Sequence, residues 1–120
     1  MKFVIHRHTT VPDHYDLMIE REGYLETYRI DEHDMMLFLQ GDEVASEKIG
    51  DHGKDYLTYE GPISCDRGHV SLFDEGEYSV ERRDADGMVL RVRSKKLEGD
   101  ISFRLHRYRG YLLRYESSAG

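Results

Sequence analysis

The chain has 120 residues, one cysteine and a formal net charge of −7 at pH 7. Its length is typical of a single domain, and its negative charge disfavours broad binding to a nucleic-acid backbone. The lone Cys65 excludes an intrachain disulfide and a sulfur-based zinc site. No segment reaches transmembrane length and the N-terminus lacks the apolar region of a signal peptide, so we expect a cytoplasmic protein with no membrane partner. We expect one domain over residues 1–116 and a flexible tail over residues 117–120.

The first predicted elements are two strands, at residues 3–8 and 14–20, joined by a turn. His14 and Asp16 are two positions apart, so both side chains leave the same face of the second strand. His8 ends the first strand, and a hairpin would bring it close to the other two. Two imidazoles and one carboxylate, with positions left open for a substrate, are typical of a catalytic divalent metal site. Two surface histidines beside a turn aspartate are the alternative interpretation.

The rest of the chain alternates apolar with polar residues in short runs separated by glycine-containing turns, which predicts antiparallel strands. The stretch from Asp31 to Gln40 is the one candidate helix, with Asp31 as its N-cap and Gly41 beyond its end. Its M-M-L-F-L segment is equally compatible with a strand. A turn at Glu75-Gly76 separates two of the predicted strands. Beyond the first hairpin, strands are predicted at 24–30, 44–49, 68–74, 77–83, 90–93, 101–106 and 111–115. About nine short strands at this spacing fit a barrel or a sandwich.

Five blocks of sequence follow one another between residues 3 and 107. They are F-V-I-H-R-H, H-Y-D-L-M-I-E, G-D-H-G-K-D-Y-x-x-Y-E-G, G-H-V-S-L-F-D-E-G-E-Y and K-K-L-E-G-D-I-S-F-R-L. In this order they resemble the 3′-phosphoesterase domain of bacterial DNA ligase D. The resemblance implies a mainly β fold, a single compact antiparallel β-barrel of about eight or nine short strands with at most one short helix near 31–40.

The resemblance also implies an activity. Members of this family are metal-dependent hydrolases that remove 3′-phosphate or 3′-ribonucleotide ends from DNA during repair and leave a 3′-hydroxyl. The implied cofactor is Mn²⁺, with Zn²⁺ or another divalent transition metal as the alternative. The implied partners are DNA 3′ ends in a primer-template, together with a ligase or polymerase acting in trans.

Site residues carry over one position at a time. The resemblance implies that His8, His14 and Asp16 are the metal ligands, which is the set that the hairpin pattern indicates independently. His52 matches a histidine that the family places against the scissile phosphate, and Tyr56 matches a tyrosine of the same site. Without the resemblance, these two residues would be read as part of a polar loop.

The sequence also departs from the family. Where the family usually has an arginine, two positions after the metal-binding aspartate, this chain has Met18, which cannot make the bidentate phosphate contact of a guanidinium. His6 stands where the family tends to carry an amide, and the chain starts at the first block, without the segment that precedes it in ligase D. The candidates for the missing phosphate contact are His6, Arg91, Arg93 and Arg104.

An iron oxygenase is the alternative enzyme. His14-x-Asp16 on a strand resembles the start of a site with two histidines and one carboxylate, in which His52 or His106 would be the third ligand. This interpretation leaves His8 and the later blocks unexplained.

A binding module is the alternative of a different class. Met18 in place of an arginine favours a catalytically weak or inactive barrel that binds nucleic-acid ends or another phosphorylated ligand. Arginines and tyrosines interleave between Arg104 and Tyr115, and we interpret this pattern as the outer face of terminal strands rather than as a nucleic-acid stacking surface.

Overall fold

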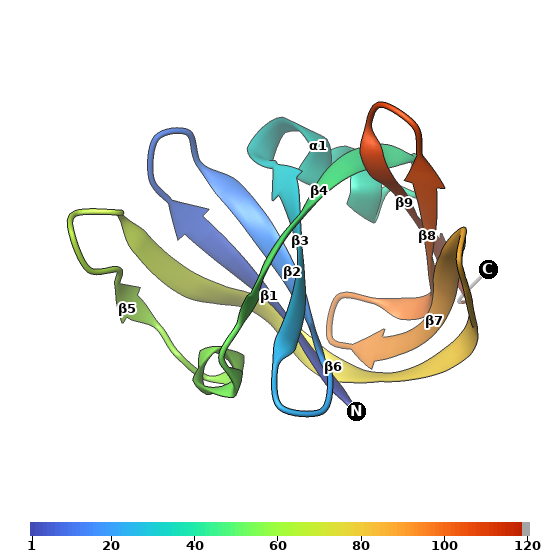
Figure 1. Ribbon diagram of the computed structural model, residues 1–120, viewed down its shortest axis with the longest axis horizontal. Helices are drawn as coiled ribbons and strands as arrows, with labels where there is room; N and C mark the ends of the chain where they lie inside the picture. The colour runs from blue at the N-terminus through green and yellow to red at the C-terminus, as the bar shows by residue number, and fades with distance from the viewer. Residues whose placement is uncertain (119–120) are drawn as a thin grey trace.

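The computed structural model describes residues 1–118 and consists mainly of one antiparallel sheet of nine strands (Figure 1). The strand order is β1-β2-β3-β4-β9-β8-β7-β6-β5, and β1 also pairs with β6. This extra pairing closes the sheet in a ring and leaves only β5 outside it, which confirms the mainly β, barrel-like fold. The elements in chain order are β1 (Lys2–Thr9), β2 (His14–Glu20), β3 (Leu25–Asp31), α1 (Glu32–Leu39), β4 (Val44–His52), η1 (Lys54–Leu57), β5 (Gly61–Pro62), β6 (His69–Asp84), β7 (Gly87–Ser94), β8 (Glu98–His106) and β9 (Gly110–Ser117).

The C-terminal boundary differs slightly from the expected one. We expected a tail from residue 117, but Ser117 still pairs with Gly99 as the last residue of β9. Residues 119–120 of that expected tail lie outside the described residues.

One predicted turn is wrong. Glu75 and Gly76 do not separate two strands, because β6 runs without interruption past both. The first half of β6 pairs with β1 and the second half with β7. A Cβ built on Gly76 would lie 2.2 Å from the carbonyl oxygen of Arg93. This glycine therefore permits the close approach of β7 where β6 changes partners, a role that glycine often has at barrel corners.

The short helix that we predicted is present as α1. Asp31 occupies its N-cap position and Gly41, with a φ of +95°, follows its C-terminal end. Met35 and Phe38 are both fully buried and three residues apart, a spacing that shares one face in a helix but opposite faces in a strand. Within residues 1–118, no helix is long and apolar enough to cross a membrane.

The ring has two apolar layers on opposite faces of the sheet. Inside, one core is built from alternate positions, for example Phe3 and Ile5 of β1 together with Leu17 of β2. The intervening positions point outward, and there Val4 and Met18 form a second cluster with Leu25. Two residues of η1, Tyr56 and Leu57, and Leu72 of β6 pack against this outer cluster. The chain from β4 through η1 and β5 thus folds over the outer face of β1 and β2.

Candidate metal centre and its cavity

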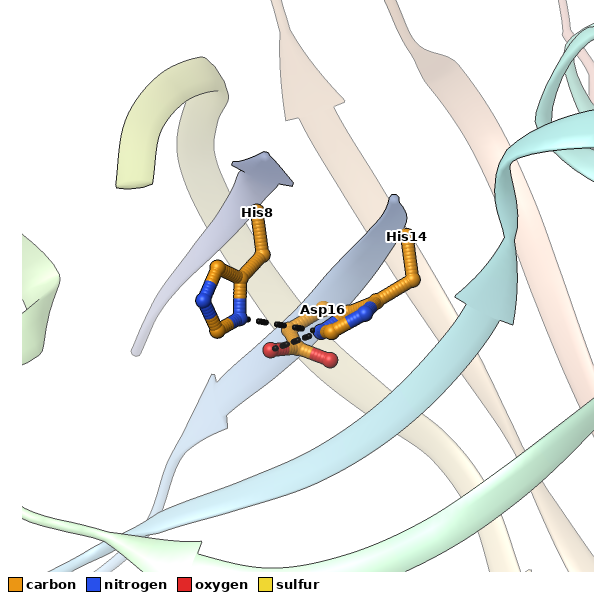
Figure 2. Close-up of side chains that lie close together, drawn as sticks. All are labelled: His8, His14 and Asp16. Carbon is orange, nitrogen blue, oxygen red and sulfur yellow. Dashed lines mark hydrogen bonds and ion pairs between the residues drawn. The ribbon is translucent and has the colours of Figure 1, made fainter. Parts of the chain in front are cut away.

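The β1–β2 hairpin gathers three ligand-type side chains on the outer face of the ring. His8 lies directly opposite His14 in the strand register, and Asp16 follows two positions later on β2. The connecting turn is fixed by Asp13, whose carboxylate accepts a 2.8 Å hydrogen bond from the backbone N–H of Thr10. Figure 2 shows the three side chains pointing toward one another from the paired strands.

The possible ligand atoms lie at the separations expected around one ion. His8 Nδ1 is 3.1 Å from His14 Nε2, which is 3.5 Å from Asp16 Oδ2. One ligand atom from each residue can be chosen so that all three lie within 4.8 Å of one another. Ligand atoms that bind one metal ion at about 2.1 Å are about 3.0 to 3.5 Å apart in tetrahedral or octahedral geometry. The three residues therefore fit a divalent transition metal.

The outer nitrogen of each imidazole is already occupied. His8 Nε2 lies 2.6 Å from the carbonyl oxygen of Arg67, and His14 Nδ1 lies 3.3 Å from that of Pro12. A carbonyl can only accept, so these outer nitrogens carry hydrogens. Histidines that bind metals are usually held in this way by a backbone carbonyl. The two inner nitrogens, His8 Nδ1 and His14 Nε2, lie 3.1 Å apart, a separation that either a shared proton or a metal ion can bridge.

Asp16 is buried between the histidines and a cation. Its Oδ2 faces His14. Its Oδ1 accepts a 3.2 Å hydrogen bond from Nε of Arg29 on β3, with which it forms an ion pair. Burial alone would raise the pKa of Asp16, but His14 and Arg29 lower it by more, so the pKa lies below its usual value. Asp16 is thus held as a carboxylate, the form that binds a metal.

His52 approaches the same cavity from the end of β4. Its Nδ1 is 3.1 Å from the carbonyl oxygen of Gly50 and 3.0 Å from Oγ1 of Thr27. Because the Thr27 hydroxyl donates to the carbonyl of Leu25, both neighbours of Nδ1 act as acceptors. The hydrogen therefore lies on Nδ1, and Nε2 is left to exchange a proton with another group.

Tyr56 of η1 lies between two histidine rings. Its ring centroid is 5.4 Å from that of His52 and 6.2 Å from that of His6, both with edge-on geometry. Among residues 1–118, its hydroxyl has no hydrogen-bond partner. This hydroxyl is therefore available to a ligand.

His6 is fully buried, and neither of its ring nitrogens has a hydrogen-bond partner within residues 1–118. Burial lowers the pKa of His6 and favours the neutral ring. Buried polar atoms normally have partners, and one that has none costs about 1 to 3 kcal/mol. His6 lines the cavity, so its ring nitrogens are available to a ligand there.

All these groups line one cavity of about 410 Å³, a size typical of ligand sites. Its lining includes His6, His8, His14, Asp16, Met18, Arg29, His52, Tyr56 and Arg67. Metal ligands, a histidine with a free ring nitrogen, a tyrosine and two arginines therefore meet in one space.

A family model described as DNA Ligase D 3′-phosphoesterase domain matches residues 5–112 of the 120-residue chain. The chain belongs to this family. No individual curated protein matches it. Membership agrees with the ordered sequence blocks and identifies the chain as a 3′-phosphoesterase domain.

Three predicted phosphate contacts of this phosphoesterase domain do not reach the cavity. Arg91 and Arg93 lie on β7 and pair with Asp100 and Glu98 of β8. Arg104 of β8 pairs with Glu43. These arginines lie on the far part of the ring, because β7 and β8 are separated from β2 by several strands in the sheet order.

The arginines that do line the cavity were missed by the sequence analysis. Arg29 lies directly opposite Asp16 in the β2–β3 register, and Arg67 lies in the loop before β6. A partial signal for Arg29 existed, since 14–20 and 24–30 were predicted as consecutive strands. A hairpin with those bounds would have placed residue 28 opposite Asp16, one position from the observed partner Arg29. Arg67 had no such signal, because loop conformation is not periodic.

Met18 faces the cavity but belongs to the outer apolar cluster. It is 1% exposed and packs with Val4 and Leu25. In the β2–β3 register it lies opposite Thr27, two pairs further from the histidines than Asp16 and Arg29. The cation next to Asp16 thus comes from the neighbouring strand.

The iron-oxygenase alternative offered His52 or His106 as a third ligand beside His14 and Asp16. His52 lines the same cavity, but within residues 1–118 the group with ligand spacing contains His8, His14 and Asp16 and not His52. His106 ends β8, where its Nδ1 accepts hydrogen bonds from the backbone N–H groups of Tyr108 and Arg109. The geometry therefore gives no support to a third ligand from His106.

Proposed function

We propose that this domain hydrolyses phosphoesters at the 3′ ends of DNA with the help of a divalent transition metal. The proposed metal is Mn²⁺. The observation that carries the proposal is the convergence of His8, His14 and Asp16 in the cavity that also holds His52. Family membership supports the phosphoesterase chemistry, and the donor geometry supports the metal.

His8, His14 and Asp16 would hold the metal, with two neutral imidazoles and one carboxylate. The bound ion would supply Lewis-acid stabilisation of a phosphate oxygen. The carbonyls of Arg67 and Pro12 keep the ligand nitrogens of the two histidines unprotonated.

His52 would deliver the proton that the leaving group needs. When water attacks phosphorus and the bond to the 3′-oxygen breaks, that oxygen must gain a proton to become a hydroxyl. Nδ1 of His52 is fixed by Gly50 and Thr27, so a second proton would be carried on Nε2. The imidazolium form of His52 would pass this proton from Nε2 to the 3′-oxygen, and the proton released by the attacking water would restore it. For a 3′-phosphate end the products are inorganic phosphate and a 3′-hydroxyl.

Arg29, His6 and Tyr56 would hold the phosphate oxygens. Arg29 contacts Asp16 through Nε alone, so its two terminal amino groups remain able to form paired hydrogen bonds with phosphate. The unpartnered nitrogens of His6 and the hydroxyl of Tyr56 add neutral donors. In this proposal Arg29 replaces the phosphate contact that Met18 cannot make.

The proposed substrates are 3′-phosphate and 3′-ribonucleotide ends, preferably on a primer-template. A 3′-hydroxyl is the end that polymerases extend and ligases join. We therefore propose that a ligase or polymerase acts in trans on the product.

The proposal is tested by incubating the purified protein with a 3′-phosphorylated primer-template and Mn²⁺, and measuring inorganic phosphate. We expect Mn²⁺-dependent release, and at least a 100-fold slower rate for Arg29→Gln, because loss of one transition-state donor has about that effect. Arg104→Gln is the matched control, since Arg104 is paired with Glu43 away from the cavity. Release that is independent of metal, or equal in both variants, would contradict the proposal.

A non-catalytic binding module is the second candidate, because Met18 gives the cavity an apolar wall beside Asp16. It predicts that the same primer-template binds in the presence of Mn²⁺ but yields no product even at high protein concentration. Phosphate release with multiple turnovers excludes it.

A further inference from the structure

A second cavity adjoins the metal centre. It has a volume of about 510 Å³ and shares Arg29 and Asp31 with the first cavity. Its floor is β4, from Ala45 to Lys48, and its far wall is the β8–β9 turn, from Tyr108 to Tyr111. In Figure 1 this turn, drawn in red, lies at the same end of the ring as α1 and the β1–β2 turn. The two cavities therefore meet at Arg29 and Asp31, and the second cavity is called the groove below.

The most exposed aromatic ring of the described chain lies on this groove. Tyr108 is 84% exposed to solvent, which is unusual for an aromatic residue. The guanidinium of Arg107 lies over its ring, 5.8 Å from the centroid. The turn itself is fixed by His106, which accepts 3.1 Å hydrogen bonds from two consecutive backbone N–H groups. Tyr108 is thus presented to solvent on an ordered turn.

Two cations of this groove differ from other arginines of the ring in their ion pairs. Arg91, Arg93 and Arg104 are each paired with a carboxylate. Lys48 and Arg109, which line the groove, have no carboxylate partner within residues 1–118. They remain available to an anion even though the chain as a whole is negative.

Carboxylates in the same lining limit what the anion can be. Asp31, Asp34 and Glu47 balance the formal charge of the three cations, Arg29, Lys48 and Arg109. Charge alone therefore cannot hold the densely charged backbone of a duplex here. An exposed aromatic ring beside two free cations is instead the combination that binds a single strand, by base stacking supported by a few phosphate contacts.

We propose that this second cavity binds the last nucleotides of the primer strand as a single strand, unpaired from the template where they lead to the reacting 3′ end, with one base stacked on Tyr108 and phosphates near Lys48 and Arg109. The inference rests on the proposed function, because it takes the first cavity as the place of the 3′ end. It assigns a role to the interleaved arginines and tyrosines of the β8–β9 turn, a pattern that the sequence analysis interpreted as structural.

The first test measures binding of a 3′-phosphorylated single-stranded DNA tail, about 8 nucleotides long, that carries one 2-aminopurine. We expect Tyr108→Ala to weaken binding by about 5-fold to 100-fold, the range for loss of one stacked base, and Tyr108→Phe to bind like the wild type. We also expect fluorescence quenching at one position of the tail, which disappears in Tyr108→Ala. Tyr24→Ala is the matched control, because Tyr24 lies in the β2–β3 turn at the opposite end of the ring.

The second test concerns the cations. We expect Lys48→Gln to weaken binding and to flatten its salt dependence, which for two phosphate contacts has a slope of about −1.4. Lys95→Gln, at an exposed lysine of the β7–β8 turn, is expected to change neither.

Activity on two substrates separates this inference from the proposed function. We expect Tyr108→Ala to raise KM for the long tail and to leave turnover of a dinucleotide 3′-phosphate unchanged. If the wild type hydrolyses neither substrate, the proposed function has failed. The binding measurements then still show whether the groove binds the DNA tail. Equal binding of the tail by Tyr108→Ala and the wild type would overturn the inference.

Discussion

The hydrogen-bond partners of each histidine decide what that residue can do in the cavity. Nε2 of His8 and Nδ1 of His14 are held by backbone carbonyls, so their other nitrogens face each other and can serve the proposed metal. His52 has its Nδ1 occupied and its Nε2 available. His6 has neither nitrogen occupied, although it is fully buried. The four histidines therefore differ in what they can do. His8 and His14 can bind a metal, His52 can transfer a proton, and His6 can contact a ligand.

His52→Ala separates catalysis from metal binding. Because His52 is not part of the ligand group, we expect an unchanged affinity for Mn²⁺ in calorimetry. We expect phosphate release to slow by about 100-fold to 10,000-fold, the usual range for loss of a general acid. His33→Ala, at an exposed position of α1, serves as the control. A His52→Ala variant with wild-type turnover would remove His52 from the reaction.

His6→Leu is expected to stabilise the protein while it impairs the activity. The substitution keeps the volume similar and removes two buried nitrogens without partners, so the free energy of unfolding of the metal-free protein should rise by about 1 kcal/mol. Phosphate release should fall, because a donor to the substrate is lost. Urea denaturation and the phosphate assay measure the two effects. Lower stability together with full activity would show that His6 is a structural residue.

At the scale of elements, two connecting segments of the chain cover the outer face of the sheet and form walls of the cavity. One is η1, which packs Tyr56 and Leu57 on the outer apolar cluster. The other is the loop before β6, in which Arg67 donates to the carbonyl and hydroxyl oxygens of Ser64 and accepts from His8 through its own carbonyl. The loop therefore holds His8, a proposed metal ligand, with its backbone while its arginine lines the cavity.

Gly68→Ala tests the contribution of this loop. Gly68 has a φ of +93°, and a Cβ built there would lie 2.1 Å from the carbonyl oxygen of Thr9. Alanine must therefore displace the loop from β1, and with it the carbonyl that orients His8. We expect weaker Mn²⁺ binding by about 10-fold to 100-fold, the usual effect of losing such an outer contact.

Gly23→Ala is the matched control for the loop. Gly23 also has a positive φ, of +87°, but a Cβ there meets no atom within 4 Å and the residue lies in the β2–β3 turn. The control should lose some stability and keep its metal affinity. Equal Mn²⁺ affinity in both variants would show that the loop does not orient His8.

At the scale of the whole molecule, the inside of the ring also contains charged groups. Glu26 is 2% exposed and pairs with Arg21 and Arg83, at 3.4 and 3.1 Å, and the hydroxyl of Tyr28 donates to its other oxygen. Burial, followed by the hydrogen bond to Glu26, raises the pKa of Tyr28 far above its usual value. The fold therefore stabilises the neutral phenol.

This shift predicts a loss of stability in alkali. The contribution of Tyr28 is fully present below the unfolded pKa of about 10 and is lost as the pH rises above it, because the unfolded chain can then ionise while the folded one cannot. Tyr28→Phe should accordingly lose less free energy of unfolding between pH 9 and 11 than the wild type, as measured by urea denaturation. Tyr24→Phe, in a turn, should behave like the wild type, and a Tyr28→Phe curve parallel to the wild-type curve would contradict the assignment.

Much of this architecture could be predicted from the sequence. Period-two alternation and glycine turns were enough to predict the strands, and the His14-x-Asp16 spacing was enough to predict that these side chains converge with His8, since both depend on local geometry. The wrong turn at Gly76 shows the limit, because a glycine that permits close approach of β7 looks in sequence like a turn glycine.

Contacts between distant parts of the chain could not be predicted. Arg67, 59 residues beyond His8, reaches it only because the ring closes between β1 and β6. The choice of Arg91, Arg93 and Arg104 as phosphate contacts assumed polar faces near the site, and the closed sheet places those strands elsewhere.

A crystal structure with Mn²⁺ and inorganic phosphate, with anomalous diffraction from the manganese, tests the central claim most directly. We expect one anomalous peak about 2.0 to 2.3 Å from His8 Nδ1, His14 Nε2 and an oxygen of Asp16, with a phosphate oxygen on the same ion and Arg29 in contact with the phosphate. A peak at other residues, or none at saturating Mn²⁺, would contradict the account.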